Sequence, residues 1–301
     1  MNKCIDVGRE GCPCALAEAG SCLVCSKIGG GTCDDCSWQG SCIYTLYEQN
    51  GRRIIDQRRE QLMNIREVRT YRPDFQVFVV EADRGFCQRA QTAGAYVFVK
   101  KPEEDPWYGL PVSVLKSEPD KGLLHLGVCI CGPKTTKLLT QTSQLSVRGI
   151  YYNGLSGLQT LMDEPEQTVV YGKGIALAPL RNLLDGGPRT AGRLKNLHLY
   201  ADLDKVGYDF FRDYFGDLPV NAIEICDFTQ IDFRKIDTSP RNNVYALSSP
   251  YYVEQIRGNF NENQPLVYPV YGNICCGEGI CGACTHNDES GRTIRSCKTV
   301  K

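Results

Sequence analysis

The feature that most constrains this chain lies near its C-terminal end, where four cysteines share a glycine-rich segment. Cys276, Cys281 and Cys284 have the spacing C-x4-C-x2-C, and Cys297 follows after twelve further residues. This spacing is typical of chains that bind a 2Fe-2S cluster, and the glycines let backbone N–H groups approach the sulfurs. A zinc site with four cysteine ligands is the alternative. Such sites more often use two C-x2-C pairs, and this segment has one. The motif therefore predicts a 2Fe-2S cluster that carries electrons, with the adjacent Cys275 as a spare.

Seventeen of the 301 residues are cysteines, and most of them gather toward the two ends of the sequence. The length allows two or three domains. The sequence has no long apolar run and no basic or apolar leader at Met1–Asp6, so we expect a soluble, cytoplasmic protein that does not contact a membrane. In such a compartment clustered cysteines more often bind metal than form disulfides. A formal net charge of -1 argues against a nucleic-acid partner.

Residues 1–50 form a cysteine-rich head with few large apolar side chains, so metal must hold this segment together. Its candidate ligands are Cys4, Cys12, Cys14, Cys22, Cys25, Cys33, Cys36 and Cys42. The two C-x2-C pairs within this set allow a zinc site. The alternative is one or two iron-sulfur clusters, most simply 4Fe-4S. Eight thiolates exceed what one ion needs, which favours clusters, but the spacing does not show which four bind.

Residues 51–67 are predicted to form a connecting helix. Ile55, Leu62 and Ile65 recur at helical spacing, and arginines are frequent between residues 51 and 72. The charged surface is either an ordinary solvated helix face or a docking patch for an acidic electron-transfer partner such as ferredoxin, since complementary charge steers encounter.

The texture of the chain then changes twice. Short β-type segments separated by turn formers dominate residues 68–161, which predicts an antiparallel β-barrel. The clearest of them are Phe75–Val80, Tyr96–Val99, Pro111–Leu115 and Leu123–Leu126. Between residues 162 and 268, strands such as Val220–Ile225 and Asn243–Leu247 alternate with helical stretches, which predicts an α/β domain with a parallel sheet. The fold class is therefore multidomain, with α+β and α/β parts, and the cluster motif occupies residues 269–301.

In this order of parts, residues 68–301 resemble the electron-transfer subunit of dihydroorotate dehydrogenase and the small subunit of NADH-dependent ferredoxin:NADP oxidoreductase, both in the ferredoxin-NADP reductase superfamily. The resemblance rests on Cys276–Cys284, then on Ala93–Val99 with Leu110–Ser113, and on Gly127–Leu139. It implies an oxidoreductase subunit whose barrel binds FAD. It assigns to the flavin the positions Tyr96, Pro111, Val112 and Ser113. It assigns to the pyrophosphate the positions Gly127, Thr135 and Thr136, and to the nucleotide turn Gly172 and Gly174.

Three departures from the family bear on how FAD and NAD(P)H bind. Leu110 replaces an arginine that would pair with phosphate or the flavin edge. Two glycines of the family's nucleotide turn are replaced within Gly172–Ala176, including one by Lys173. Ser248 begins a Ser-Ser-Pro sequence where the family usually has Cys-Gly-Pro beside the nicotinamide. We therefore expect FAD to bind and NAD(P)H binding to be doubtful.

Together these observations predict a subunit that passes electrons between FAD and a 2Fe-2S cluster. It would work in a hetero-oligomer with a catalytic oxidoreductase subunit, with ferredoxin, or with both, and the head would add a further redox centre. Two alternatives remain open. The first is a cluster-only relay or scaffold that has lost nucleotide binding, and the second is a zinc-dependent interaction module whose head docks a partner.

Overall fold

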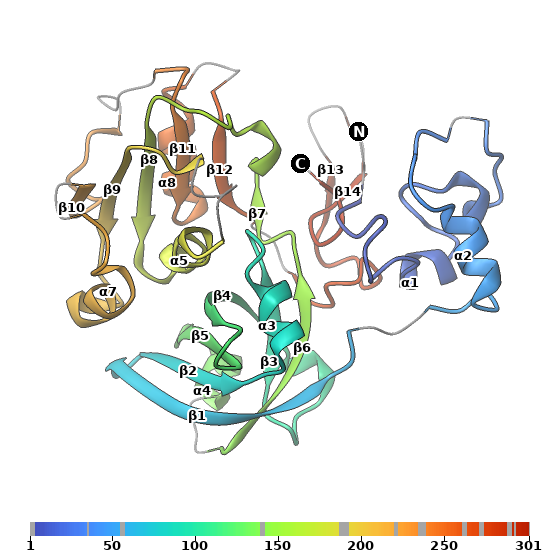
Figure 1. The fold of residues 1–301 in the computed structure, drawn as a ribbon, viewed down its shortest axis with the longest axis horizontal. Coiled ribbons are helices and arrows are strands. Elements are labelled where there is room, and N and C mark those ends of the chain that lie inside the picture. Colours follow the sequence, from blue (N-terminus) through green and yellow to red (C-terminus); the bar gives the residue numbers. More distant parts are fainter. Residues whose placement is uncertain are drawn as a thin grey trace.

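The structure is a computed structural model that describes residues 4–34, 36–54, 58–138, 142–186, 193–219, 222–233, 239–260, 264–270, 274–287, 291 and 293–300. It has four parts, namely a head, a β-barrel, an α/β sheet and a C-terminal hairpin module (Figure 1). None of the described helices is long and apolar enough to cross a membrane.

Six antiparallel strands close the barrel in the order β1-β2-β5-β4-β3-β6. They are β1 (Gln61–Arg72), β2 (Phe75–Glu81), β3 (Tyr96–Lys100), β4 (Leu110–Glu118), β5 (Leu123–Cys129) and β6 (Gln144–Tyr151), with α3 (Arg84–Ala90) and α4 (Pro133–Leu138) between strands. Val80, Val97, Leu126 and Val147 are fully buried inside it. The antiparallel barrel predicted from the short β-type segments and the turn formers between them is confirmed.

The connecting helix predicted over residues 51–67 was wrong, because residues 61–67 belong to β1. Leu62 and Ile65 are three positions apart, as on a helix, but their neighbour Met63 faces the core while Leu62 is 62% exposed. Ile65 pairs with Val80 of β2, and Leu62 pairs with Ser146 of β6. Barrel closure supplies both rows of hydrogen bonds, which outweighs the local helical spacing. Ile55 lies outside the described residues.

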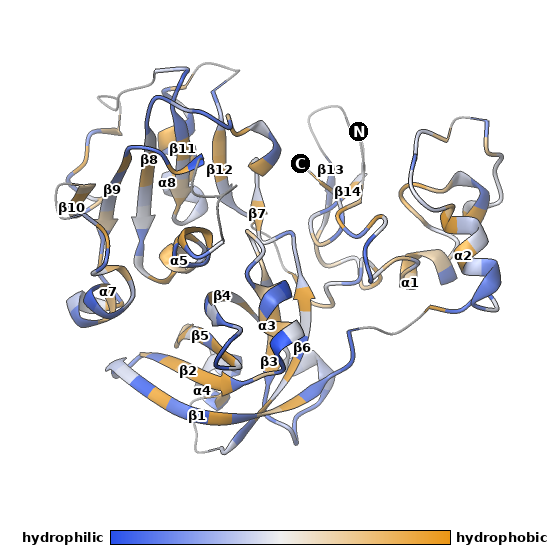
Figure 2. Cartoon of the chain, in the orientation of Figure 1, coloured by the Kyte–Doolittle hydropathy of each residue, from blue (hydrophilic) through white to orange (hydrophobic). Residues whose placement is uncertain are grey.

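A second sheet has the order β10-β9-β8-β11-β12-β7, parallel except for β7 against β12. Its strands are β7 (Leu155–Ser156), β8 (Thr168–Lys173), β9 (Leu197–Asp202), β10 (Ile223–Ile225), β11 (Asn243–Leu247) and β12 (Leu266–Pro269). Helices α5 (Ala178–Leu184), α7 (Gly207–Phe215) and α8 (Pro250–Arg257) pack on it. The predicted α/β domain is confirmed, although residues 220–221 of one predicted strand lie outside the described part of the chain. Figure 2 shows hydrophobic residues concentrated on the strands of the barrel and this sheet.

One apolar cluster joins the barrel to the α/β sheet, separate from the cluster inside the barrel. Phe75 of β2 packs edge-on against Phe210 of α7, with ring centroids 4.9 Å apart. Nearby, the Tyr214 hydroxyl donates to His125 Nδ1 at 2.9 Å, and His125 Nε2 donates to Glu118 at 3.0 Å. This tautomer follows because an ionised carboxylate only accepts hydrogen bonds. Burial lowers the pKa of His125 although Glu118 acts in the opposite direction, so the buried imidazole is neutral at neutral pH.

The head and the C-terminal hairpin lie together, and both ends of the chain meet there (Figure 1). The hairpin consists of β13 (Thr285–Asn287) and β14 (Thr293–Arg295), and the head contains α1 (Ala15–Glu18) and α2 (Ile43–Gln49). Cys4 forms an antiparallel bridge with Thr299, and the Ile5 N–H donates to the Lys298 carbonyl at 2.9 Å. The head's own apolar cluster is small, with Val7 and Ile43 as its buried members besides Cys4.

Candidate functional site

The four tail cysteines come together in one loop and the hairpin that follows it. The Cys284 thiol donates to Cys297 Sγ at 3.2 Å, and both residues are buried, with exposed fractions of 5% and 1%. Cys276 is hydrogen-bonded to Cys297 and to Cys281. The hydrogen bond with Cys297 lowers the pKa of Cys276 and raises that of Cys297. Four positions selected by sequence spacing therefore form a single thiol cluster in space.

The glycines of the motif are required by the path of the loop. Gly277, Gly279 and Gly282 have φ values of +73°, +75° and +73°, which side chains other than glycine adopt rarely. A Cβ atom on Gly277 would lie 2.6 Å from the Tyr151 ring. The turn also aims a backbone donor inward, since the Glu278 N–H donates to Cys276 Sγ at 3.3 Å. The backbone of the loop thus hydrogen-bonds one of its own sulfurs.

The donor set is of the kind that binds a two-iron cluster. All four members are thiols, and each iron of a 2Fe-2S cluster takes two of them. Within the described part of the chain, no three His, Cys, Asp or Glu side chains are arranged to hold one metal ion. A backbone N–H directed at a sulfur is the kind of contact that tunes such a centre.

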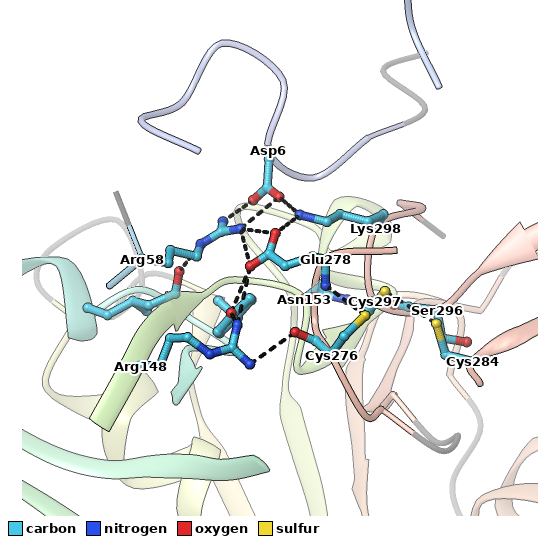
Figure 3. Close-up of polar contacts among 12 residues, drawn as sticks. Asp6, Arg58, Arg148, Asn153, Cys276, Glu278, Cys284, Ser296, Cys297 and Lys298 are labelled. Carbon is cyan, nitrogen blue, oxygen red and sulfur yellow. Dashed lines mark hydrogen bonds and ion pairs between the residues drawn. The ribbon is translucent and has the colours of Figure 1, made fainter. Parts of the chain in front are cut away.

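A network of buried charges lies directly against this loop (Figure 3). Lys298 Nζ lies 2.6 Å from Asp6 Oδ2 and 2.8 Å from Glu278 Oε2, and its side chain is 0% exposed. Arg58 pairs with the same two carboxylates and is 7% exposed. Arg148 donates to the Cys276 carbonyl at 3.1 Å. The network thus connects the head, the entry to the barrel, β6 and the thiol loop.

The buried positive and negative charges of this network compensate one another. Burial alone would raise the pKa of Asp6, but the charges of Lys298 and Arg58 lower it below its ordinary value. Glu278 behaves in the same way, with a further hydrogen bond from the Tyr151 hydroxyl at 2.7 Å. Both carboxylates are therefore ionised, as buried charges are when cations pair with them.

Sequence reasoning missed these charged residues. Glu278 stands between two glycines of the cluster motif, and Lys298 directly follows Cys297. The available signal was the charge of Glu278 inside a tight glycine-rich turn. The partners of Lys298 and Glu278, Asp6 and Arg58, could not be identified, because they lie more than two hundred residues away.

The eight head cysteines divide by burial. Cys4 is buried; Cys12, Cys14, Cys22 and Cys25 are half-buried; Cys33, Cys36 and Cys42 are exposed. One pocket is lined by Cys4, Cys12, Cys14 and Cys22. The structure therefore separates the predicted ligands into an inner and an outer group.

The residues that the resemblance assigns to the flavin lie on β3 and β4. Tyr96 pairs with Ser113, and Val97 pairs with Val112. The Tyr96 ring stacks on Tyr151 at 5.2 Å, and its buried hydroxyl has no hydrogen-bond partner. The Val112 side chain lies in the barrel core, whereas Pro111 is exposed. An orphaned buried hydroxyl beside a half-buried Ser113 is compatible with a polar ligand at this edge.

The residues assigned to the pyrophosphate are engaged by the protein itself. Thr135 is buried, and its hydroxyl oxygen accepts from the N–H groups of Cys131 and Gly132 at 2.9 and 3.0 Å. Thr136 donates to the Gly132 carbonyl at 3.0 Å. Gly127 faces the second domain, where a Cβ would lie 2.5 Å from Ile175 Cδ1. These contacts fix the turn before α4.

The nucleotide turn after β8 is acidic and closely packed. Gly172 is covered by Leu177, whose Cδ2 would lie 2.1 Å from a Cβ there, and Gly174 has a φ of +56°. Lys173 forms an ion pair with Asp202 and lies 3.6 Å from Asp204. These three residues line a hollow with Cys226 and Asp227 at the carboxyl ends of β8, β9 and β10. Arg72 also lines the hollow, but Lys173 is already paired, and the carboxylates of Asp202, Asp204 and Asp227 outnumber the cations that a nucleotide phosphate would meet.

No protein-family model matches the sequence, and no curated protein does. Solved structures do match it. One is the NADH-dependent reduced ferredoxin-NADP oxidoreductase, at 16% identity, with 79% of this chain and 86% of that chain covered and a TM-score of 0.56. The fold is that of the ferredoxin-NADP reductases. Phthalate dioxygenase reductase, which transfers electrons from pyridine nucleotides to a 2Fe-2S centre, shares 15% identity over 80% and 95% of the two chains, with a TM-score of 0.54. The ferredoxin NADP+ reductase of Neisseria gonorrhoeae, solved with FAD and NADP, shares 12% identity over 70% and 98%, with a TM-score of 0.53.

Proposed function

We propose that this chain is an iron-sulfur flavoprotein subunit that passes electrons between FAD in the barrel and a 2Fe-2S cluster in the tail, and onward to a partner oxidoreductase or ferredoxin. The observation that carries the proposal is the thiol cluster of Cys276, Cys281, Cys284 and Cys297. It stands on a fold shared with reductases that use flavin and, in one case, a 2Fe-2S centre.

One aromatic group connects the two candidate cofactor sites. Tyr96, on the predicted flavin strand, stacks on Tyr151. Gly277, in the thiol loop, packs against Tyr151 and Phe98. When bound, FAD and the cluster supply the redox chemistry themselves, and the protein supplies distance and environment. In this proposal both sites lie against the same aromatic residues, so a short path separates them.

The acidic hollow after β8 supports a route in which electrons do not come from NAD(P)H. Lys173 is neutralised by Asp202 and Asp204, which leaves no free cation from this turn for a phosphate.

The docking patch proposed on the arginines of residues 51–72 falls partly on β1, where Arg66 is exposed. A negatively charged protein partner fits that surface.

A cluster-only relay is the second candidate, and the contact between Gly127 and Ile175 favours it. Together with the internal hydrogen bonds of Thr135, this contact means that atoms of the protein occupy the position at which the family binds FAD. Flavin content of the isolated protein separates the two candidates directly.

The test is anaerobic purification followed by iron, acid-labile sulfide, zinc and flavin analysis, with electron paramagnetic resonance of the reduced protein. We expect flavin to co-purify and a 2Fe-2S signal to disappear in Cys281→Ser and Cys284→Ser. Cys275→Ser is the matched control, since Cys275 is exposed and adjacent to the motif. A signal that survives in either ligand variant refutes the cluster assignment. Clusters without flavin would select the relay, and zinc without iron would select an interaction module.

A further inference from the structure

Four of the head cysteines, which spacing alone could not single out, line a common pocket. Its wall is otherwise mainly apolar, with Leu16, Leu23, Val24 and Ile43 among its residues. The cysteines are Cys4, Cys12, Cys14 and Cys22. They come from 19 consecutive positions of the chain, which loops around the pocket and returns through α1.

All four cysteines contribute to the wall of this one pocket. Cys4 is buried, and Cys12, Cys14 and Cys22 are half-buried. The pocket therefore gathers four thiols that are wholly or partly shielded from solvent.

The other head cysteines lie outside this pocket. Cys33, Cys36 and Cys42 are exposed. Cys25 contributes through its backbone, since its N–H donates to Cys22 Sγ at 3.3 Å. Such a hydrogen bond supports a thiolate ligand without making its donor a ligand. Of the pair Cys22 and Cys25, only Cys22 therefore lines the pocket.

We propose that Cys4, Cys12, Cys14 and Cys22 are the four ligands of one 4Fe-4S cluster. In such a cluster each iron takes one thiolate, so the ligands surround a volume rather than converge on a point. The arrangement agrees with this requirement, because the four thiols line the wall of one pocket. An apolar wall with a backbone N–H at one sulfur is a suitable environment for a buried cluster.

This head pocket is adjacent to the tail thiol loop. Leu16 lines the pocket, and the same side chain lies 3.0 Å from the position of a Cβ on Gly279 of the loop. Asp6, also in the pocket wall, pairs with Lys298, the residue after Cys297. One layer of side chains therefore separates the two thiol groups. Resting on the proposed function, the head cluster is a relay that carries electrons between the tail cluster and a partner at the head.

The experiment compares single variants of the full-length protein. Cys12→Ser and Cys22→Ser should each lose ~4 irons per chain and the same paramagnetic signal, with the 2Fe-2S signal of the tail retained. Cys36→Ser should keep that head signal, and Cys226→Ser, outside both thiol groups, should keep all iron. If Cys36→Ser loses the same signal as Cys12→Ser, or if the head yields zinc instead of iron, the proposed ligand set is overturned.

A measurement on the unmodified protein covers the case in which the variants fail to fold. Anaerobic alkylation with iodoacetamide, read by mass spectrometry, should leave all four pocket cysteines unmodified while the iron is bound. They should become reactive together after the iron is removed with an oxidant and a chelator. Alkylation of any of the four in protein that keeps its full iron content overturns the proposal. If the unmodified protein lacks the 2Fe-2S signal of the tail but keeps the signal of the head, the result contradicts the proposed function and leaves the head site standing.

Discussion

Lys298 and Asp6 form a fully buried ion pair across 292 positions of the chain, with 2.6 Å between Nζ and Oδ2. The contact joins the segment that carries Cys4 to the segment that carries Cys297. Removing one member of a buried pair leaves the other charge in a site that water cannot reach, which costs ~3–5 kcal/mol. The two candidate redox sites therefore depend on each other for stability.

Replacing this lysine tests that dependence. We expect Lys298→Met to lower the free energy of unfolding of the head by ~3–5 kcal/mol, because Asp6 and Glu278 lose a shared cation. Urea unfolding can be followed by the fluorescence of Trp38, which packs in the head's apolar cluster, in a Trp107→Phe background. The control is Arg52→Gln, whose ion pair with Glu48 is on the surface. Equal stability of the two variants would contradict the role assigned to the network.

The glycines of the thiol loop allow a matched pair of substitutions. Gly277 and Gly291 both have positive φ, +73° and +76°, but only Gly277 has atoms within 4 Å of an added Cβ. Gly277→Ala should therefore displace the loop from Tyr151 and remove most of the 2Fe-2S signal. Gly291→Ala should carry only the ~1–2 kcal/mol of backbone strain and keep the signal. Similar loss of signal in both variants would show that the close approach is unimportant.

The hollow after β8 predicts poor reduction by nicotinamide nucleotides. Its carboxylates, together with Leu110 in place of an arginine, should make bleaching of the bound flavin by NADH or NADPH slow or undetectable in the isolated chain. Dithionite should bleach the same sample completely, which shows that the flavin is reducible. Rapid stoichiometric bleaching by either nucleotide would show that the acidic hollow does not exclude it.

The barrel and the α/β domain should separate more easily in acid. The pKa of buried His125 lies below its ordinary value of 6.5, so below about pH 6.5 the unfolded chain binds a proton that the folded chain does not. Stability should then fall as pH decreases from this value, with a contribution of at most ~1.4 kcal/mol per pH unit. The groups that act on His125 are Glu118, Arg69, Lys116 and Tyr214.

The measurement is the pH dependence of the unfolding free energy between pH 5 and 7.5 in the unmodified protein and in His125→Gln. The variant should be less stable at pH 7.5, since the link between Glu118 and Tyr214 is broken, and its profile should be flatter. Parallel profiles would assign the acid sensitivity to other groups.

Local pattern predicted those parts of the molecule whose partners are close in sequence or whose chemistry fixes the spacing. The short β-type segment Phe75–Val80 identified β2, and C-x4-C-x2-C identified the thiol loop. It failed for β1, because Leu62 and Ile65 have helical spacing and only pairing with β2 and β6 shows the strand. It also could not choose among the head cysteines, because the pocket depends on how residues 4–22 loop back.

The meeting of the two ends of the chain also sets an order of events during synthesis. Asp6 leaves the ribosome before its partner Lys298 and before Thr299, the bridge partner of Cys4, both of which follow almost 300 residues later. The head must therefore remain undocked while the barrel and the sheet are made. Iron delivered to the head before that point would reach thiols that still lack the tail residues against which they finally pack.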